Sequence, residues 1–128
     1  MDKKEELCKY RFEQAKETIG VAKLCLDNGH YKDSINRSYY AAFYAVKSVL
    51  ALDDIDFKRH KDVIAYFNQH YIATEVYDKE IGRNLSRLQK KRESSDYDDF
   101  VIASKEEAEE QLQAAQSIID AIEDKLSL

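Results

Sequence analysis

The sequence predicts an all-α protein, an antiparallel up-and-down bundle of four to five helices that forms a single domain over residues 1–128. Three observations support this fold class. The chain contains no proline and only three glycines, and 35% of its residues are charged, which is typical of long helices with solvated outer faces. Apolar residues recur at alternating spacings of four and three, the period of an amphipathic helix. A chain of 128 residues also has enough apolar surface for one core but not for two.

The first two helices are predicted over residues 2–27 and 31–52. In the first, the predicted inner stripe consists of Cys8, Phe12, Ala15, Ile19, Ala22 and Leu26. Asn28 and Gly29 should end this helix, because glycine adopts the left-handed conformation that closes a helix without strain. In the second, the predicted inner stripe consists of Ile35, Tyr39, Ala42, Val46 and Val49.

The remaining helices are predicted over residues 60–71, 74–92 and 104–126. Thr74 is the expected N-cap of the fourth helix, and residues 93–102 are expected to form a polar connector. Ser104 and Glu107 have the spacing of a capping box at the start of the fifth helix. Because the connections between the helices are short, neighbouring helices must run antiparallel.

Cysteine, histidine and charge content exclude several classes of protein. Cys8 and Cys25 lie about 25 Å apart on one predicted helix, so they cannot pair within it. The three histidines show no zinc-ligand spacing, and we therefore expect neither a metal nor a cofactor. The first residues are charged and no apolar run approaches membrane-spanning length, which favours the cytoplasm and no membrane association. The net charge of −5 arises from residues 104–128, which carry two positive and seven negative side chains.

The run NRSYYAAFYA on the second predicted helix combines one arginine with three tyrosines. Arg37 and Tyr44 are seven residues apart and share one helix face, and Ala41 between them is expected to leave a shallow gap. An arginine can clamp a phosphate with two hydrogen bonds, and a tyrosine ring can stack on a base. We therefore expect Arg37, Tyr40 and Tyr44 to bind a nucleotide or an RNA strand. The alternative is structural, with Arg37 paired to Asp33 one turn earlier and the tyrosines filling the core.

A basic stripe on the fourth predicted helix is a second candidate for phosphate binding. Arg83, Arg87 and Lys90 recur at helical spacing on the face opposite its apolar stripe. The alternative is a solvated face, because cations are favoured near the C-terminal end of a helix.

Four further residues are expected to have structural roles. Arg92 can pair with Asp96, while Tyr97 buries its ring and ties the connector to the bundle. His60 opens the third helix on its inward face and is expected to pack or cap there. The sequence contains no Ser/His/Asp arrangement, glycine-rich phosphate loop or paired-carboxylate signature, so the residues alone assign no catalytic group.

In their order, these motifs resemble those of the small stand-alone HEPN-domain proteins, whose name denotes a nucleotide-binding domain of higher eukaryotes and prokaryotes. The resemblance covers roughly residues 7–122. It rests on RSYYAAFYA from Arg37, HKDVI from His60 with Phe67 after it, and Arg92 followed by DYD from Asp96. It implies a bundle of four or five antiparallel helices, commonly a homodimer, with the motif helix facing a cleft near the dimer axis.

Many HEPN proteins are metal-independent endoribonucleases that use an arginine followed, after four to six residues, by a histidine. In this chain the three corresponding positions after Arg37 hold Ala42, Phe43 and Tyr44, so the expected general base is missing. Ser38 also replaces the more polar residue that often follows the arginine. The resemblance therefore favours a component that binds a nucleotide or RNA phosphate over an active ribonuclease.

Other HEPN proteins are encoded beside a minimal nucleotidyltransferase and act as the toxin of a toxin-antitoxin pair. In these toxins, a tyrosine two residues after the motif histidine can be adenylylated by the partner. Tyr44 falls on that position, so the resemblance implies a nucleotidyltransferase partner and Tyr44 as the candidate modification site. Two alternatives remain. One is an active endoribonuclease in which Arg37 acts with His60 as the base, and the other is a structural dimerisation module whose interface is the Arg/Tyr face.

Overall fold

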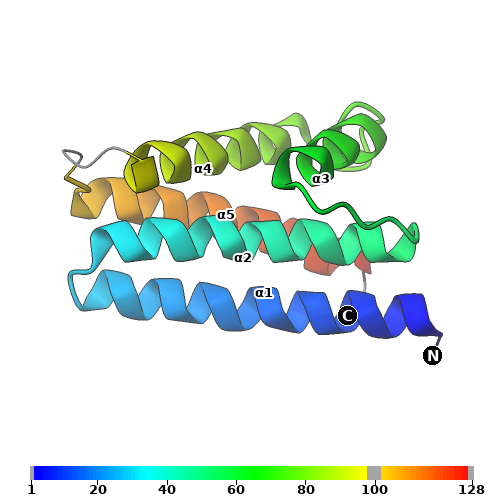
Figure 1. Ribbon diagram of the computed structural model, residues 1–128, viewed down its shortest axis with the longest axis horizontal. Helices are drawn as coiled ribbons and strands as arrows, with labels where there is room; N and C mark the ends of the chain where they lie inside the picture. The colour runs from blue at the N-terminus through cyan, green and yellow to red at the C-terminus, as the bar shows by residue number, and fades with distance from the viewer. Residues whose placement is uncertain (1, 98–101, 127–128) are drawn as a thin grey trace.

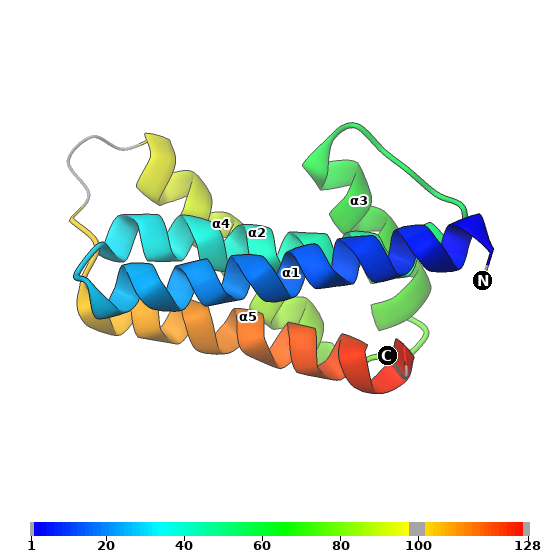
Figure 2. The same ribbon diagram turned by 90° about the horizontal axis from the view of Figure 1, so that it is seen from below.

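A computed structural model describes residues 2–97 and 102–126 of the chain. These residues form the predicted all-α bundle, with helices α1 (Lys3–Asp27), α2 (Tyr31–Leu52), α3 (His60–Phe67), α4 (Lys79–Tyr97) and α5 (Lys105–Leu126). The four long helices lie side by side, and the short α3 sits at one end of the bundle, inclined to them (Figures 1 and 2). Across the described residues, no helix is long and apolar enough to cross a membrane.

The predicted ends of α1 and α5 are confirmed by their local geometry. Helix α1 ends at Asp27, and Gly29 adopts φ +78°, the left-handed conformation that glycine tolerates best. At the start of α5, the hydroxyl of Ser104 accepts the backbone N–H of Glu107 at 3.1 Å and donates to its carboxylate at 3.2 Å. The first of these two bonds satisfies a backbone donor, the N–H of Glu107, that has no partner within the helix.

The third helix differs from the prediction in its last turn. Regular α-helix ends at Phe67 and is followed by a π-helical turn, η1 (Asn68–Ile72). The backbone N–H of Ala73 donates to the carbonyl of Asn68 at 2.8 Å, a spacing of five residues. In this wider turn the side chains no longer follow the period of an α-helix. A pattern of apolar residues at spacings of four and three therefore does not predict the turn.

The fourth helix begins later and ends later than predicted. It starts at Lys79 because the capping residue is Asp78 and not Thr74. The carboxylate of Asp78 accepts the backbone N–H of Glu80 at 2.9 Å. Thr74 instead donates its hydroxyl to the carbonyl of His70 at 2.7 Å. The helix continues through residue 97, so residues 93–97 of the predicted connector are helical, while residues 98–101 lie outside the described part of the chain.

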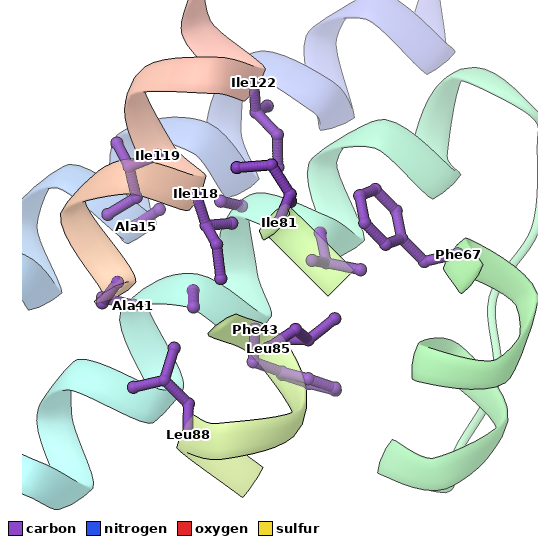
Figure 3. Packing of buried hydrophobic residues seen from close by; sticks show 14 of the residues in the cluster. Ala15, Ala41, Phe43, Phe67, Ile81, Leu85, Leu88, Ile118, Ile119 and Ile122 are labelled. Carbon is purple, nitrogen blue, oxygen red and sulfur yellow. The ribbon is translucent and has the colours of Figure 1, made fainter. Parts of the chain in front are cut away.

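Helix α2 lies at the centre of the bundle and contacts α1, α3, α4 and α5. The predicted inner stripe is confirmed, since its five members are at most 2% exposed. The core cluster also includes residues from every other long helix, such as Ala15, Leu85 and Ile118 (Figure 3). Ala41 does not leave the predicted surface gap. It is 0% exposed and belongs to this cluster, because neighbouring helices cover a wider arc of α2 than one apolar stripe.

Candidate functional site

Three side chains on one face of α2 form a continuous column. The Cζ atom of Arg37 lies 5.0 Å from the centre of the Tyr40 ring, within the range of a cation–π interaction. The centres of the Tyr40 and Tyr44 rings are 6.1 Å apart, and the rings are tilted by 40°. All three side chains are half-buried. The structure thus brings together the three residues predicted to bind a nucleotide or RNA, and that role stays a prediction.

Arg92 of α4 fixes the middle of this column. Its Nη2 donates to the hydroxyl of Tyr40 at 3.2 Å, and its Cζ lies 5.1 Å and 5.3 Å from the ring centres of Tyr39 and Tyr40. Its Nε lies 3.2 Å from Oδ2 of Asp96, one turn later on α4. The expected Arg92–Asp96 pair is therefore present, but within a helix instead of a connector. The predicted burial of the Tyr97 ring lies outside the described side chains.

Arg37 is held by a neutral amide and not by an acid. Its Nε and Nη2 donate to Oδ1 of Asn36 at 3.1 Å and 2.6 Å. The amide nitrogen of Asn36 in turn donates to Oδ2 of Asp96 at 3.4 Å. Among the described residues no ion pair joins Arg37 to Asp33, the alternative partner, and the guanidinium lies over the Tyr40 ring in the next turn. Asp96 therefore touches Arg92 directly and Arg37 only through Asn36.

His60, the first residue of α3, packs into a group of aromatic rings from α2. Its ring stacks on Phe43 with centres 4.1 Å apart, and it meets Tyr40 edge to face at 5.7 Å. Its Nδ1 lies 3.0 Å from the hydroxyl oxygen of Tyr39. Burial lowers the pKa of His60, and the positive charges of Arg92 and Lys47 lower it further. The imidazole is therefore neutral at pH 7.

The buried hydroxyl of Tyr39 decides which nitrogen of His60 carries the proton. Tyr39 is 0% exposed, and burial raises its pKa to about 12, so its hydroxyl stays protonated. Within the described residues, the only hydrogen-bond partner of this hydroxyl is Nδ1 of His60. A buried O–H without an acceptor is costly, so Tyr39 donates to Nδ1. The remaining proton of the neutral ring then lies on Nε2, which makes His60 a hydrogen-bond donor on that side.

Three neighbours of the site were not assigned a role from the sequence. Asn36 holds Arg37, and Phe43 carries the His60 ring. Lys47 lies with its Nζ 5.9 Å from the centre of the Phe43 ring and 3.7 Å from Oδ1 of Asp56. A sequence signal existed for Lys47, which follows Tyr44 by three residues and so extends the same face. Among residues 2–97 and 102–126, no three His, Cys, Asp or Glu side chains form a group that could hold a metal ion.

The basic stripe on α4 is partly neutralised by its own helix. Arg83 and Arg87 both bond the carboxylate of Glu80, at 3.1 Å and 3.3 Å. Arg87 also donates to Oδ1 of Asn84 at 3.1 Å. Lys90 is exposed. The intramolecular pairs lower the positive potential that a phosphate would meet here, so this stripe is a weaker candidate than the column on α2.

Comparison with known proteins gives a family match and several relatives. The HEPN domain model matches residues 8–125. A UPF0332 protein from Thermotoga maritima is 33% identical over 96% of this chain and 93% of its own length. A Methanocaldococcus jannaschii protein named "Putative toxin MJ0605" is 32% identical over 89% of this chain and 84% of its own length. The crystal structure of an archaeal HEPN homologue matches the fold with a TM-score of 0.72 and 19% identity, covering 92% of this chain and 96% of that one.

The lowered pKa of His60 predicts a loss of stability in acid. In the unfolded chain histidine titrates near pH ~6.5, whereas the folded site favours the neutral ring. The contribution of the neutral His60 ring to the free energy of unfolding is thus fully present above pH ~6.5. It is lost as the pH falls through the lower pKa that His60 has in the folded protein. Urea unfolding from pH 8 to pH 5 should show the free-energy advantage of wild type over His60→Asn shrinking below pH ~6.5. A difference that stays constant with pH would contradict the buried, neutral histidine.

Proposed function

Since this chain belongs to the HEPN domain family, we propose that it binds the phosphate of a nucleotide or of RNA at Arg37, with Tyr40 and Tyr44 lining the site. The uncompensated charge of Arg37 carries this proposal. Arg92 is neutralised by Asp96, but Arg37 forms no ion pair within the described residues. A half-buried cation that is held by an amide and a ring, with no carboxylate in direct contact, is available to attract an anion.

The geometry leaves one edge of the Arg37 guanidinium available. Its Nε and Nη2 bond Asn36, while Nη1 makes no hydrogen bond to a described residue. Arginine binds phosphate through such an edge because two parallel N–H groups match two phosphate oxygens. The contacts to Asn36 and Tyr40 hold the guanidinium in place before the ligand arrives, so less conformational entropy is lost on binding.

The tyrosines supply the surface for a base. Tyr40 is fixed by Arg92 and by the edge of His60, and Tyr44 extends the column by one turn. Stacking of a base on an aromatic side chain contributes about 1–3 kcal/mol to binding and does not depend on the identity of the base. The ring of His60 meets the ring of Tyr40 edge to face and helps to hold it in place. A cation next to a stacking surface suits a nucleotide or a short stretch of single-stranded RNA.

Replacing Arg37 tests the binding site. We expect Arg37→Ala to raise the dissociation constant for ATP or for a labelled single-stranded RNA at least about tenfold, because a charge-assisted bidentate contact is lost. Circular dichroism should show unchanged helicity, since Arg37 lies on the rim of the core. The control Arg83→Ala removes the same charge from the α4 stripe and should bind as wild type does. Equal affinities of Arg37→Ala and wild type would sink the proposal, and a loss only in Arg83→Ala would move the site to α4.

We further propose that the protein is the HEPN member of a cytoplasmic toxin-antitoxin-like pair with a nucleotidyltransferase. The relationship to proteins named putative toxins supports this pairing. The hydroxyls of Tyr39 and Tyr40 are bonded to His60 and Arg92, whereas that of Tyr44 makes no hydrogen bond to a described residue. Of these three tyrosines, Tyr44 is therefore the proposed acceptor of the modification. Its oxygen would bond the α-phosphorus of ATP as pyrophosphate leaves and the phenolic proton is released.

Mass spectrometry tests this modification. After incubation with ATP and the nucleotidyltransferase encoded in an adjacent gene, we expect one AMP per chain on wild type and on Tyr40→Phe. Tyr44→Phe should carry none, because the acceptor oxygen is removed. AMP on a different residue, or a gene neighbourhood without a nucleotidyltransferase, would argue against the pairing.

One observation favours ribonuclease activity as a second candidate. The His60 ring lies on Phe43, one of the three positions at which a HEPN ribonuclease carries its histidine. A base so placed could take the 2′-hydroxyl proton while Arg37 stabilises the charge on phosphorus. It would require the other tautomer of His60, with the proton on Nδ1 and the Tyr39 hydroxyl left without an acceptor. This cost makes binding the favoured function.

Incubation with RNA in the presence of a chelator separates the two functions. If His60 is a general base, wild type should cleave, and His60→Asn should be slower by about 10²-fold or more. Arg37→Ala should be inactive as well. Wild type that leaves a range of RNA substrates intact would remove the ribonuclease candidate while leaving the binding site untouched.

A further inference from the structure

Most of helix α2 leaves only one narrow row of side chains accessible, and a cation stands at each end of that row. Between residues 34 and 51, every side chain of the helix is buried except those of five half-buried residues, which are Asn36, Arg37, Tyr40, Tyr44 and Lys47. The last four recur at spacings of three, four and three, so they lie in one row along the helix. The column of Arg37, Tyr40 and Tyr44 therefore continues for almost one further turn and ends at Lys47.

The two cations of this row lie over different aromatic rings. The Cζ atom of Arg37 is 5.0 Å from the centre of the Tyr40 ring, whereas Nζ of Lys47 is 5.9 Å from the centre of the Phe43 ring. The centres of these two rings are 6.5 Å apart. Along the helix axis, Arg37 and Lys47 are separated by about 15 Å. We therefore expect each end of the row to hold a phosphate group of its own.

The positive charge at the Lys47 end is only partly balanced. Nζ of Lys47 and Nη2 of Arg11, from α1, lie 3.7 Å and 3.5 Å from the same carboxylate oxygen, Oδ1 of Asp56. Within the described residues neither cation has another acidic partner, so two positive charges share one negative charge. The side chains of Lys47 and Arg11 are only 25% and 11% exposed, and limited contact with water weakens the screening of their charge.

Asp56 is a weakly held counter-ion. It lies in the segment between α2 and α3, which runs back along the bundle from the end of α2 (Figures 1 and 2). Its side chain is 68% exposed, and both of its ion pairs are longer than a charge-assisted hydrogen bond, so they contribute little to stability. Asp53, in the same segment, already accepts the hydroxyls of Tyr66 and Tyr71 at 3.2 Å and 2.6 Å. A phosphate group can therefore displace Asp56 from Lys47 or bind beside it.

We propose that Lys47 forms a second phosphate-binding subsite, with Asp56 as the counter-ion that a phosphate displaces. The ligand carries two phosphate groups, one at Arg37 and one at Lys47, with a base against the tyrosines between them. A nucleoside triphosphate holds its phosphates next to one another, whereas a single strand places a sugar and a base between successive phosphates. The inference deepens the proposed function, on which it rests, and assigns a strand of two or more nucleotides as the ligand.

Two probes of different length test the subsite by NMR titration. They are AMP, which has one phosphate, and the 5′-phosphorylated trinucleotide of adenosine, 2′-O-methylated so that it cannot be cleaved. Lys47→Gln removes the charge and keeps most of the side chain, so it should raise the dissociation constant of the strand at least about fivefold and leave that of AMP unchanged. Lys47→Arg should restore the affinity. The control Lys79→Gln removes the same charge from an exposed position at the start of α4 and should bind both probes as wild type does.

The salt dependence of binding and the Asp56 carboxylate give two further readouts, which a purely structural role of Lys47 would not change. For a single strand, each phosphate contact adds about 0.7 to the slope of log K against log salt concentration, so Lys47→Gln should reduce that slope by about 0.7. Asp56→Asn removes the competing carboxylate and should lower the dissociation constant of the strand at least about twofold. Damage to the fold would weaken binding, so a gain in affinity reports on the charge itself.

The outcomes distinguish a failure of this subsite from a failure of the Arg37 site. If Arg37→Ala weakens the binding of both probes, but Lys47→Gln binds the strand with the affinity and salt slope of wild type, the Lys47 subsite is refuted and the Arg37 site stands. An Asp56→Asn protein that binds the strand no more tightly than wild type would refute the role of Asp56 as the displaced counter-ion. If wild type binds neither probe, the Arg37 site is refuted and the subsite with it.

Discussion

The core and the site both depend on one packing constraint, which is that the neighbouring helices must come close to α2. The alanines at positions 41, 42 and 45 are fully buried, and their small side chains let the neighbouring backbones come close. Because this packing covers most of the circumference of α2, only a narrow face remains for Arg37, Tyr40 and Tyr44. The site is therefore built directly on the helix that contacts α1, α3, α4 and α5.

Tyr40 joins the helices that surround this narrow face. Its ring meets Arg37 and its hydroxyl binds Arg92, so a single side chain links α2 to α4. The two arginines differ in what balances them, since Asp96 neutralises Arg92 while Asn36 merely orients Arg37. Arg92 thus has a structural role, and the positive charge of Arg37 is available to a ligand. An Asp in place of Asn36 would preserve the geometry and remove much of that attraction.

The Tyr39–His60 hydrogen bond ties α3 to the same face and determines its chemistry. A fully buried hydroxyl must donate somewhere, and in doing so it places the histidine proton on Nε2. The family resemblance concerns a histidine on the motif helix, but here the imidazole comes from α3 and is oriented as a donor. This supports a binding role for the site.

The sequence by itself determined the all-α class, the inner stripe of α2, that of α1 except for the half-buried Leu26, and the column of Arg37, Tyr40 and Tyr44, because the 3.6-residue period links residues within one helix. Only the tertiary structure decided the partners that cross between helices. It brought His60 onto Phe43, Arg92 onto Tyr40 and Ala41 into the core, since these contacts depend on the rotation and crossing of packed helices. The π-turn after Phe67 and the late start of α4 likewise depend on backbone hydrogen bonds and caps that periodicity does not encode.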